Sequence, residues 1–143
     1  MISLSHLTMR LAGGGHQITI LDDVTLEIPD KQRVAIVGPS GSGKSTLLGL
    51  IAGLDRPTSG SITLNGVEIS TMRESALARY RRDHIGYIFQ SFHLIPTLTA
   101  LENVLVPLEL AGMSTAQARA TELLQTVGLG DRLHHYPVQL SGG

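Results

Sequence analysis

The 143-residue sequence contains no cysteine and no tryptophan, and it has almost no net charge. Without cysteine, neither a disulfide nor a thiolate-bound metal site can form. A formal net charge of -1 gives no electrostatic case for a nucleic-acid surface, so we expect no nucleic-acid partner. No apolar run approaches the ~18 residues that a membrane-spanning helix needs. Residues 1–6 lack the basic and apolar regions of a signal peptide, which favours a cytosolic compartment.

Hydrophobic residues make up 42% of the sequence and charged residues only 16%. This balance is typical of a folded globular chain and not of a disordered one. A chain of 143 residues is also long enough to form one compact domain with a core.

The most informative stretch is residues 34–51. The apolar run Val-Ala-Ile-Val at 34–37 predicts a buried strand, and Leu-Leu-Gly-Leu-Ile at 47–51 predicts an apolar helix. Between them, residues 38–46 fit the G-x-x-x-x-G-K-[ST] pattern of a phosphate-binding P-loop. The alternative is a flexible Gly/Ser connector, which the strand before and the helix after disfavour.

The residue types in this loop suit an anion. Glycines allow a backbone with φ > 0, so the loop N–H groups can turn inward around a phosphate, and the helix beginning near Lys44 adds its positive dipole end. Lys44 offers a compact positive charge for the β- and γ-phosphates, and the Ser45 hydroxyl can bind Mg²⁺. The predicted nucleotide site comprises Gly38, Pro39, Ser40, Gly41, Ser42, Gly43, Lys44, Ser45 and Thr46.

Strand patterns surround this loop. Residues 2–11 alternate apolar and polar, residues 12–15 predict a turn, and residues 18–21 and 24–28 predict further strand. Another short strand, 61–64, runs into an Asn-Gly turn of the hairpin type. Residues 84–89 predict a second buried strand that ends at Gln90.

Helical patterns occupy the remainder. Residues 74–82 predict a charged, exposed helix; its arginines at 79, 81 and 82 allow an anion patch, although a solvated face is favoured. Residues 100–110 and 115–127 carry apolar residues at helical spacing, including Ala118 and Val127 in the second range. We expect Glu102 in the first turn of the helix 100–110, and Ser114 as the cap of the helix 115–127. We therefore expect an α/β core over residues 1–90 and a helical subdomain over residues 91–143.

Taken together, the motifs resemble those of ATP-binding cassette (ABC) ATPases. The P-loop is similar to their Walker A motif, and Gln90 within Tyr-Ile-Phe-Gln-Ser-Phe resembles their Q-loop. The final Leu-Ser-Gly-Gly is similar to the start of the LSGGQ signature, and residues 98–104 also resemble the family. Residues 49–55 and 94–99 look most like the lipoprotein-release and macrolide-export subgroup.

This resemblance implies an α/β P-loop NTPase core with an antiparallel N-terminal β subdomain and an inserted helical subdomain. It implies an ATPase subunit, with ATP and Mg²⁺ as cofactors, that serves a membrane permease as a peripheral protein on the cytoplasmic face of the inner membrane. Two copies would form a homodimer around two ATP molecules. Lys44 and Gln90 would be catalytic, and Ser45 and Gln90 would complete the Mg²⁺ shell. Across the dimer, the γ-phosphate would meet Ser141, Gly142 and Gly143.

The sequence departs from the family pattern in two places. Leu11 stands where the family usually has an aromatic residue to stack on adenine, and every aromatic residue here comes after residue 79. Walker B and the catalytic glutamate, which should follow the signature, are not in the sequence. We therefore expect a longer protein of ~220 residues, and negligible hydrolysis by residues 1–143 alone.

Two other functions stay open at this point. One is a soluble ABC-type mechanical ATPase acting on DNA or ribosomes, although the long coiled-coil or tandem insertions of those proteins are not found here. The other is a nucleotide-binding module without turnover.

Overall fold

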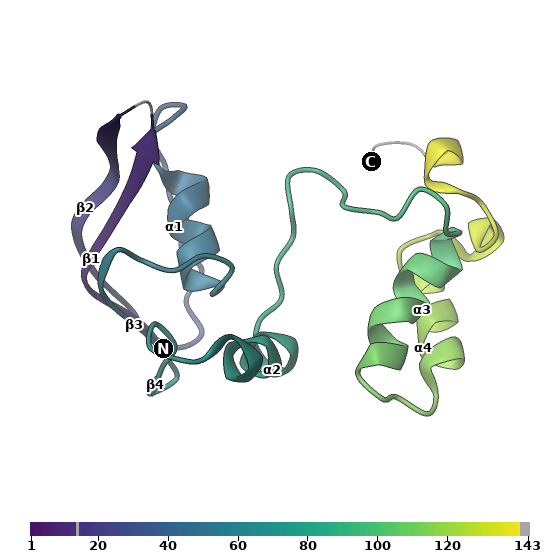
Figure 1. The fold of residues 1–143 in the computed structure, drawn as a ribbon. Coiled ribbons are helices and arrows are strands. Elements are labelled where there is room, and N and C mark those ends of the chain that lie inside the picture. Colours follow the sequence, from purple (N-terminus) through teal and green to yellow (C-terminus); the bar gives the residue numbers. More distant parts are fainter. Residues whose placement is uncertain (14, 141–143) are drawn as a thin grey trace. The chain divides into compact units, whose positions relative to one another are not determined.

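The computed structural model describes residues 1–13 and 15–140, and the chain divides into two compact units, Met1–Tyr87 and Ile88–Gly143 (Figure 1). The first unit holds an antiparallel sheet and two helices, and the second is helical. This architecture confirms the predicted fold class. Across the described ranges, no helix has the length and apolar character needed to cross a membrane.

The sheet of the first unit has the strand order β2-β1-β3-β4, and all of its pairs are antiparallel. Strand β1 (Ile2–Gly13) covers the predicted strand 2–11, and β2 (His16–Ile28) joins the two short strands predicted at 18–21 and 24–28. The pairing of β1 with β2 contains register shifts of the β-bulge type, and Asp23 in β2 has a φ of 49°. Bulges of this kind disturb the pairing locally, but the two strands stay paired on both sides of them.

The third and fourth strands form the predicted hairpin. Strand β3 (Ser59–Leu64) turns through Asn65 and Gly66 into β4 (Val67–Glu68). The two turn residues have φ values of 50° and 80°, as a two-residue type I′ turn requires.

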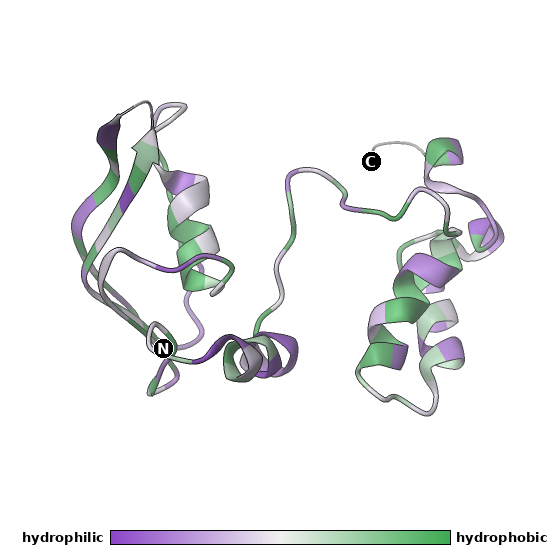
Figure 2. Ribbon diagram, in the orientation of Figure 1, coloured by the Kyte–Doolittle hydropathy of each residue, from purple (hydrophilic) through white to green (hydrophobic). Residues whose placement is uncertain are grey.

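Helix α1 (Lys44–Ile51) and helix α2 (Glu74–His84) complete the first unit. In Figure 2, α1 is mostly white to green, whereas α2 is mostly purple. The apolar α1 buries Leu47 and Leu50 in a core that α2 enters mainly through Leu77. The sheet contributes Leu4, Leu7, Leu21, Ile62 and Leu64 to the same core. Because α1 begins at Lys44, this packing fixes the end of the P-loop.

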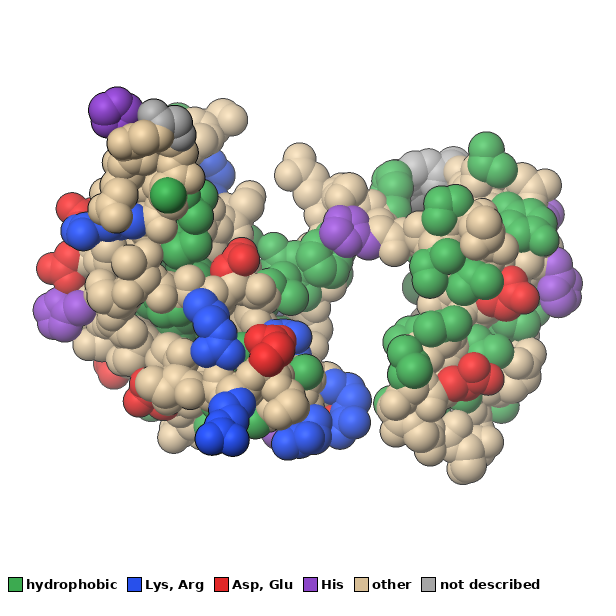
Figure 3. Space-filling view, in the orientation of Figure 1, with side chains coloured by type: hydrophobic (Ala, Val, Ile, Leu, Met, Phe, Trp, Pro, Cys, Tyr) green, Lys and Arg blue, Asp and Glu red, His purple; other side chains and the backbone are tan. Residues whose placement is uncertain are grey.

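The arginines of α2 do not share one environment. Arg81 donates from Nη1 to the Gly53 carbonyl at 2.6 Å and from Nη2 to Glu74 at 3.0 Å, and only 26% of its side chain is exposed. Arg82 pairs with the adjacent Asp83. Figure 3 shows acidic side chains mixed with the basic ones on this side of the first unit. The prediction of a solvated face is therefore wrong for Arg81, which ties α2 to the end of α1.

Two predicted strands are not strands in the structure. Residues 34–37 and 85–89 have no strand assignment, and Val37 and Ile88 are 86% and 99% exposed. An apolar run forms a strand only when at least one neighbouring strand pairs with its backbone N–H and C=O groups. Within the described residues, every paired strand belongs to the β2-β1-β3-β4 sheet, which offers these two runs no partner.

The second unit is built on helices α3 (Ala100–Leu110) and α4 (Ala116–Thr126), followed by the 3-10 turns η1 (Gly130–Arg132) and η2 (Pro137–Gln139). Both long helices were predicted. Their shared core comprises Ala100, Leu101, Ala120 and Leu124.

Two details of α4 differ from the prediction. Its buried face is Ala116, Ala120 and Leu124, whereas Ala118 is exposed and Val127 is 68% exposed. The N-cap is Thr115, not Ser114, and it makes no side-chain cap bond. Ala116 and Ala120 are four residues apart and so lie on one face of α4, followed on that face by Leu124. Because these alanines are small, this face can pack closely on α3, and it is the face that is buried.

Helix α3 begins with a reciprocal capping box. The Glu102 N–H donates to the Thr99 hydroxyl at 3.3 Å, and the Thr99 N–H donates to the Glu102 carboxylate at 2.7 Å. The bond from the Thr99 N–H, followed by the bond from its hydroxyl, lowers the pKa of the Glu102 carboxyl. This arrangement confirms that Glu102 lies in the first turn.

Candidate functional site

The P-loop runs from Gly38 to Lys44 as a tight turn. The Ser42 N–H donates to the Pro39 carbonyl at 3.3 Å. Gly41 and Gly43 have φ values of 81° and 84°, in the left-handed region that glycine adopts without a steric cost. The loop therefore needs glycine at these two positions.

The loop also lies directly against strand β2. A Cβ atom on Gly43 would lie 2.9 Å from the Ile20 carbonyl oxygen and 3.0 Å from Leu21 Cδ2. A Cβ on Gly38 would lie 2.9 Å from the Ser42 hydroxyl. At position 43 only a residue without a Cβ fits, because the close atom is a backbone oxygen, whereas the Ser42 hydroxyl near Gly38 can rotate away. The loop borders a cavity of about 260 Å³ that Leu21, Lys44 and Leu47 also line.

Lys44 places a positive charge over this loop. Its Nζ donates to the carbonyls of Gly38 at 2.8 Å and Pro39 at 2.6 Å, and to the Ser42 hydroxyl at 3.3 Å. These three acceptors engage the three N–H donors of the ammonium group, and Lys44 is among the residues that line the cavity. A phosphate bound here would replace part of this bonding and would gain a charge that the loop already keeps in place.

Helix α1 begins at the same point. Gly43 is its N-cap and has no side chain to cap the first turn, and the first intrahelical bond runs from the Leu47 N–H to the Gly43 carbonyl at 2.8 Å. The amides of residues 44–46 precede that bond, so the helix offers them no acceptor. Oriented amides, the helix dipole and the ammonium group together fit a phosphate chain, and the exposed Ser45 can supply a hydroxyl ligand to Mg²⁺.

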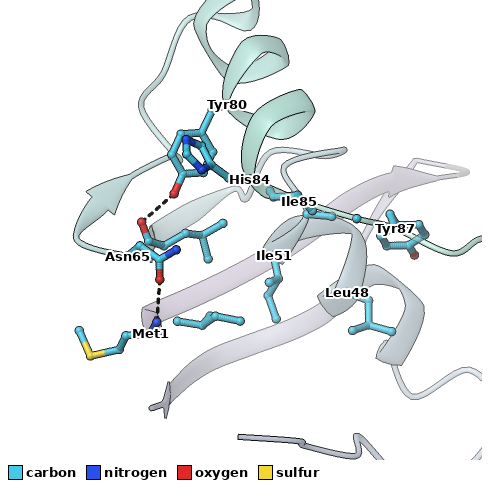
Figure 4. Close-up of a pocket in the computed structure, with 12 residues that line it drawn as sticks. Met1, Leu48, Ile51, Asn65, Tyr80, His84, Ile85 and Tyr87 are labelled. Atoms are coloured by element: carbon cyan, nitrogen blue, oxygen red, sulfur yellow. Dashed lines mark hydrogen bonds between the residues drawn. The ribbon is translucent and has the colours of Figure 1, made fainter. Parts of the chain in front are cut away.

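A larger cavity of about 350 Å³ lies elsewhere in the first unit (Figure 4). It is lined by apolar side chains from α1 together with Tyr80, His84 and Asn65, and by no Lys, Arg, Asp or Glu. The Tyr80 hydroxyl is already engaged, since it donates to the Leu64 carbonyl at 2.9 Å. The Met1 ammonium group also borders this cavity, but it is paired with Asp30 and donates to Asn65 Oδ1 at 2.7 Å. No glycine-rich loop is among the described residues that line it.

The other predicted site residues lie outside this loop. Gln90 is an exposed residue of the second unit, and residues 141–143 fall outside the described part of the chain. Leu11 is 47% exposed on β1 and is paired with Ile18, which is 54% exposed, so it is not a core residue.

The sequence reasoning missed the part of β2 that supports the loop. The Ile20 carbonyl and the Leu21 side chain form the wall behind Gly43. No local signal could have identified them, because the contact joins residues far apart along the chain.

Comparison with known families decides the affiliation of the chain. The family described as "ABC transporter" matches residues 21–143, which include the whole loop. The chain belongs to the ABC transporter family. The resemblance predicted from the motifs is thereby confirmed.

Named relatives within the ABC family agree with this assignment. The chain is 48% identical to the uncharacterized ABC transporter ATP-binding protein YbbA of Escherichia coli K12, over all of this chain and 64% of YbbA. It is 49% identical to the macrolide export ATP-binding/permease protein MacB of Burkholderia pseudomallei, over all of this chain and 22% of MacB. The MacB match agrees with the predicted subgroup, and these relatives lend no support to the DNA or ribosome alternative.

A solved ABC cassette has the same fold. The dimeric post-hydrolysis structure of the cassette MJ0796, bound to ADP and Pi, superposes with a TM-score of 0.91 at 40% identity. The match covers 99% of this chain and 64% of the MJ0796 chain. The present chain thus spans about two thirds of the length of YbbA and of MJ0796.

Proposed function

We propose that this chain is the nucleotide-binding part of the ATP-binding subunit of an ABC transporter, in which ATP binding and hydrolysis drive transport by a partner permease. The observation that carries the proposal is the glycine loop with Lys44 held over it at the start of α1. The names of YbbA and MacB support the transport role.

Within this proposal, each site residue has a separate task. Lys44 and the N–H groups of residues 38–46, other than Pro39, would hold the β- and γ-phosphates of ATP, and Lys44 would also neutralise charge as the γ-phosphate leaves. The family resemblance implies that the Ser45 hydroxyl and the Gln90 carboxamide would be ligands of Mg²⁺, and that Gln90 would orient the reacting groups. Bound Mg²⁺ would supply further charge neutralisation at the phosphates.

The proposal includes a second copy of the chain and a membrane partner. Ser141, Gly142 and Gly143 would contact the γ-phosphate held by the second copy, as part of a homodimer. The dimeric form of MJ0796 supports this arrangement, and the ATP-binding/permease name of MacB supports the permease. The subunit would lie on the cytoplasmic face of the inner membrane, with residues 1–90 as the ATP-binding core and β subdomain and residues 91–143 as the helical subdomain.

The experiment that tests this function uses the complete protein purified with and without membranes from its own cell. We expect Mg²⁺-dependent ATP hydrolysis, and co-purification with a multi-spanning membrane protein. Failure to bind ATP would reject the proposal. Hydrolysis that DNA or ribosomes stimulate, without a membrane partner, would favour the mechanical ATPase instead.

A second test concerns the nucleotide base. An aromatic ring stacked on a base contributes ~1–3 kcal/mol, and an apolar leucine supplies only part of that. We therefore expect GTP to compete with ATP within about tenfold, and Leu11→Tyr to tighten ATP binding by about threefold to tenfold. Because Leu11 is 47% exposed, the larger ring should fit without lowering the melting temperature.

The matched control for this test is Val67→Tyr, which adds the same ring at a 38% exposed position of β4. Strand β4 is separated from β1 by β3, so its ring should leave nucleotide affinity unchanged. Equal affinities for wild type and Leu11→Tyr, measured by nucleotide titration, would remove Leu11 from the base site.

A further inference from the structure

The C-terminal end of α1 is closed by backbone bonds and by a close contact with α2. The Gly53 N–H donates to the Leu50 carbonyl at 3.0 Å, and the Leu54 N–H donates to the Gly49 carbonyl at 2.9 Å. Gly53 has a φ of 64°, so these two bonds form a Schellman cap. A Cβ on Gly53 would lie 2.9 Å from Leu77 Cδ1, so α2 packs directly on this cap.

A guanidinium group from α2 binds the carbonyl of the same glycine. Arg81 Nη1 donates to the Gly53 carbonyl at 2.6 Å, and Arg81 Nη2 donates to Glu74 Oε1 at 3.0 Å. The other carboxylate oxygen of Glu74 lies 3.6 Å from Arg56 Nη2. Because a guanidinium group is planar, its two arms fix the cap of α1 relative to the first turn of α2.

Arg81 also supplies a positive charge that α1 lacks at this end. The last turn of α1, residues 48–51, has the sequence Leu-Gly-Leu-Ile and carries no cation of its own. A cation near a helix C-terminus stabilises the helix through its dipole. An eight-residue helix is too short to be stable alone, so α1 depends on contacts of this kind.

The cap and the phosphate end of α1 are close together. Eight residues at a rise of 1.5 Å give a helix of about 12 Å. Lys44 is the first of these residues, and the amides of residues 44–46 are those offered to a phosphate chain. A tilt of so short a helix moves both of its ends, so a contact at the cap also sets the direction of these amides.

We propose that Arg81 is a positioning residue for the phosphate chain of the nucleotide. By holding the Gly53 carbonyl, it fixes the tilt of α1, and so the direction in which Lys44 and the amides of residues 44–46 face the phosphates. This inference rests on the proposed function, and it gives Arg81 no contact with ATP. Groups that are held in place before binding need less ordering when the ligand arrives, so loss of the Arg81 bond weakens binding without abolishing it.

The test compares Arg81→Gln with Arg82→Gln in the complete protein. The carboxamide of Arg81→Gln is too short to reach the Gly53 carbonyl. Arg82→Gln is the matched control, since it makes the same change at the next residue, whose guanidinium group pairs with Asp83. With Mg²⁺ and well below the melting temperature, we expect Arg81→Gln to raise the Kd of ATP about threefold to tenfold, and Arg82→Gln to stay within about twofold of wild type.

Inorganic tripolyphosphate shows which part of the nucleotide responds. It carries the phosphates without a base, so Arg81→Gln should raise its Kd by the same factor as that of ATP. A loss of ATP affinity without a loss of tripolyphosphate affinity would contradict the proposal, because the effect would then lie at the base and not at the start of α1.

A measurement on wild type does not depend on the folding of a variant. Coupling between two sites is reciprocal, so phosphate binding must stabilise the cap that Arg81 holds. Saturating tripolyphosphate should slow hydrogen exchange of the Leu54 amide by about threefold or more. The Asn65 amide, which donates to the Met1 carbonyl at 2.8 Å in the β3–β4 turn, is the control and should keep its exchange rate.

The outcomes separate this inference from the proposed function. Wild-type protein that binds neither ATP nor tripolyphosphate would reject the function and this inference with it. Normal binding by wild type, with unchanged affinities in Arg81→Gln, would overturn the role of Arg81 alone, even if the melting temperature falls. An equal loss of affinity in Arg82→Gln would overturn it as well, because the effect would then follow net charge. Should Arg81→Gln fail to fold, an unchanged exchange rate of the Leu54 amide in wild type decides against Arg81.

Discussion

Replacing Gly43 by alanine is expected to destabilise the protein substantially. Alanine at φ 84° incurs ~1–2 kcal/mol of left-handed backbone strain. The new Cβ would lie 2.9 Å from the Ile20 carbonyl oxygen, a backbone atom that cannot move aside cheaply, and overpacking of this kind costs ~1–3 kcal/mol. We therefore expect Gly43→Ala to lower the free energy of unfolding by ~2–5 kcal/mol. ATP affinity should fall as well, since any relief of the contact moves the loop.

Gly41→Ala is the matched control for this prediction. Gly41 has nearly the same φ, 81°, but a Cβ there would meet no atom within 4 Å. It should therefore show only the strain of ~1–2 kcal/mol. Chemical denaturation of both variants measures the difference. If Gly43→Ala and Gly41→Ala lower the free energy of unfolding by the same amount, the contact between Gly43 and the Ile20 carbonyl does not restrict the residue type at position 43.

The loop shows why a motif can be predicted from sequence. Its glycines, Lys44 and Ser45 are consecutive, and the chemistry of phosphate binding sets both their types and their spacing. The structure gives Gly41 and Gly43 the positive φ values that this chemistry needs. Local signals succeed elsewhere for the same reason, in the Asn65-Gly66 turn and in the bounds of α3.

Contacts between distant segments could not be predicted in this way. Residues 34–37 and 85–89 have the composition of buried strands, yet composition says nothing of whether a pairing strand is at hand. Arg81 looked like any solvated helix arginine, because the Gly53 carbonyl that binds it lies in another segment. Asn103 in α3 bonds to the backbone of residues 95–99, and these bonds depend on the path of a loop, which leaves no periodic pattern in the sequence.

Replacing Lys44 by alanine is expected to weaken ATP binding by about tenfold or more. A charge-assisted hydrogen bond contributes ~1.5–3 kcal/mol, and 1.4 kcal/mol corresponds to about tenfold in affinity. The structure adds a second cause of weakening. The Lys44 ammonium also bridges the carbonyls of Gly38 and Pro39, so its loss frees the loop that must be ordered around the phosphates. Titration of the complete protein with ATP and Mg²⁺ measures both effects together.

Lys31→Ala separates this local effect from a general change of charge. Lys31 is the only other lysine of the sequence, it is exposed in the same unit, and the described structure gives it no ion pair. Its removal changes the net charge by the same amount but should change ATP affinity by less than about twofold, because exposed charges are screened over about 10 Å.

Lys44→Arg adds a test of shape, since its planar guanidinium keeps the charge but cannot reproduce a compact ammonium between two carbonyls. We expect Lys44→Arg to bind ATP more weakly than wild type. Equal affinity in wild type and Lys44→Ala would show that the loop does not bind phosphate, and the proposed function would fail with it.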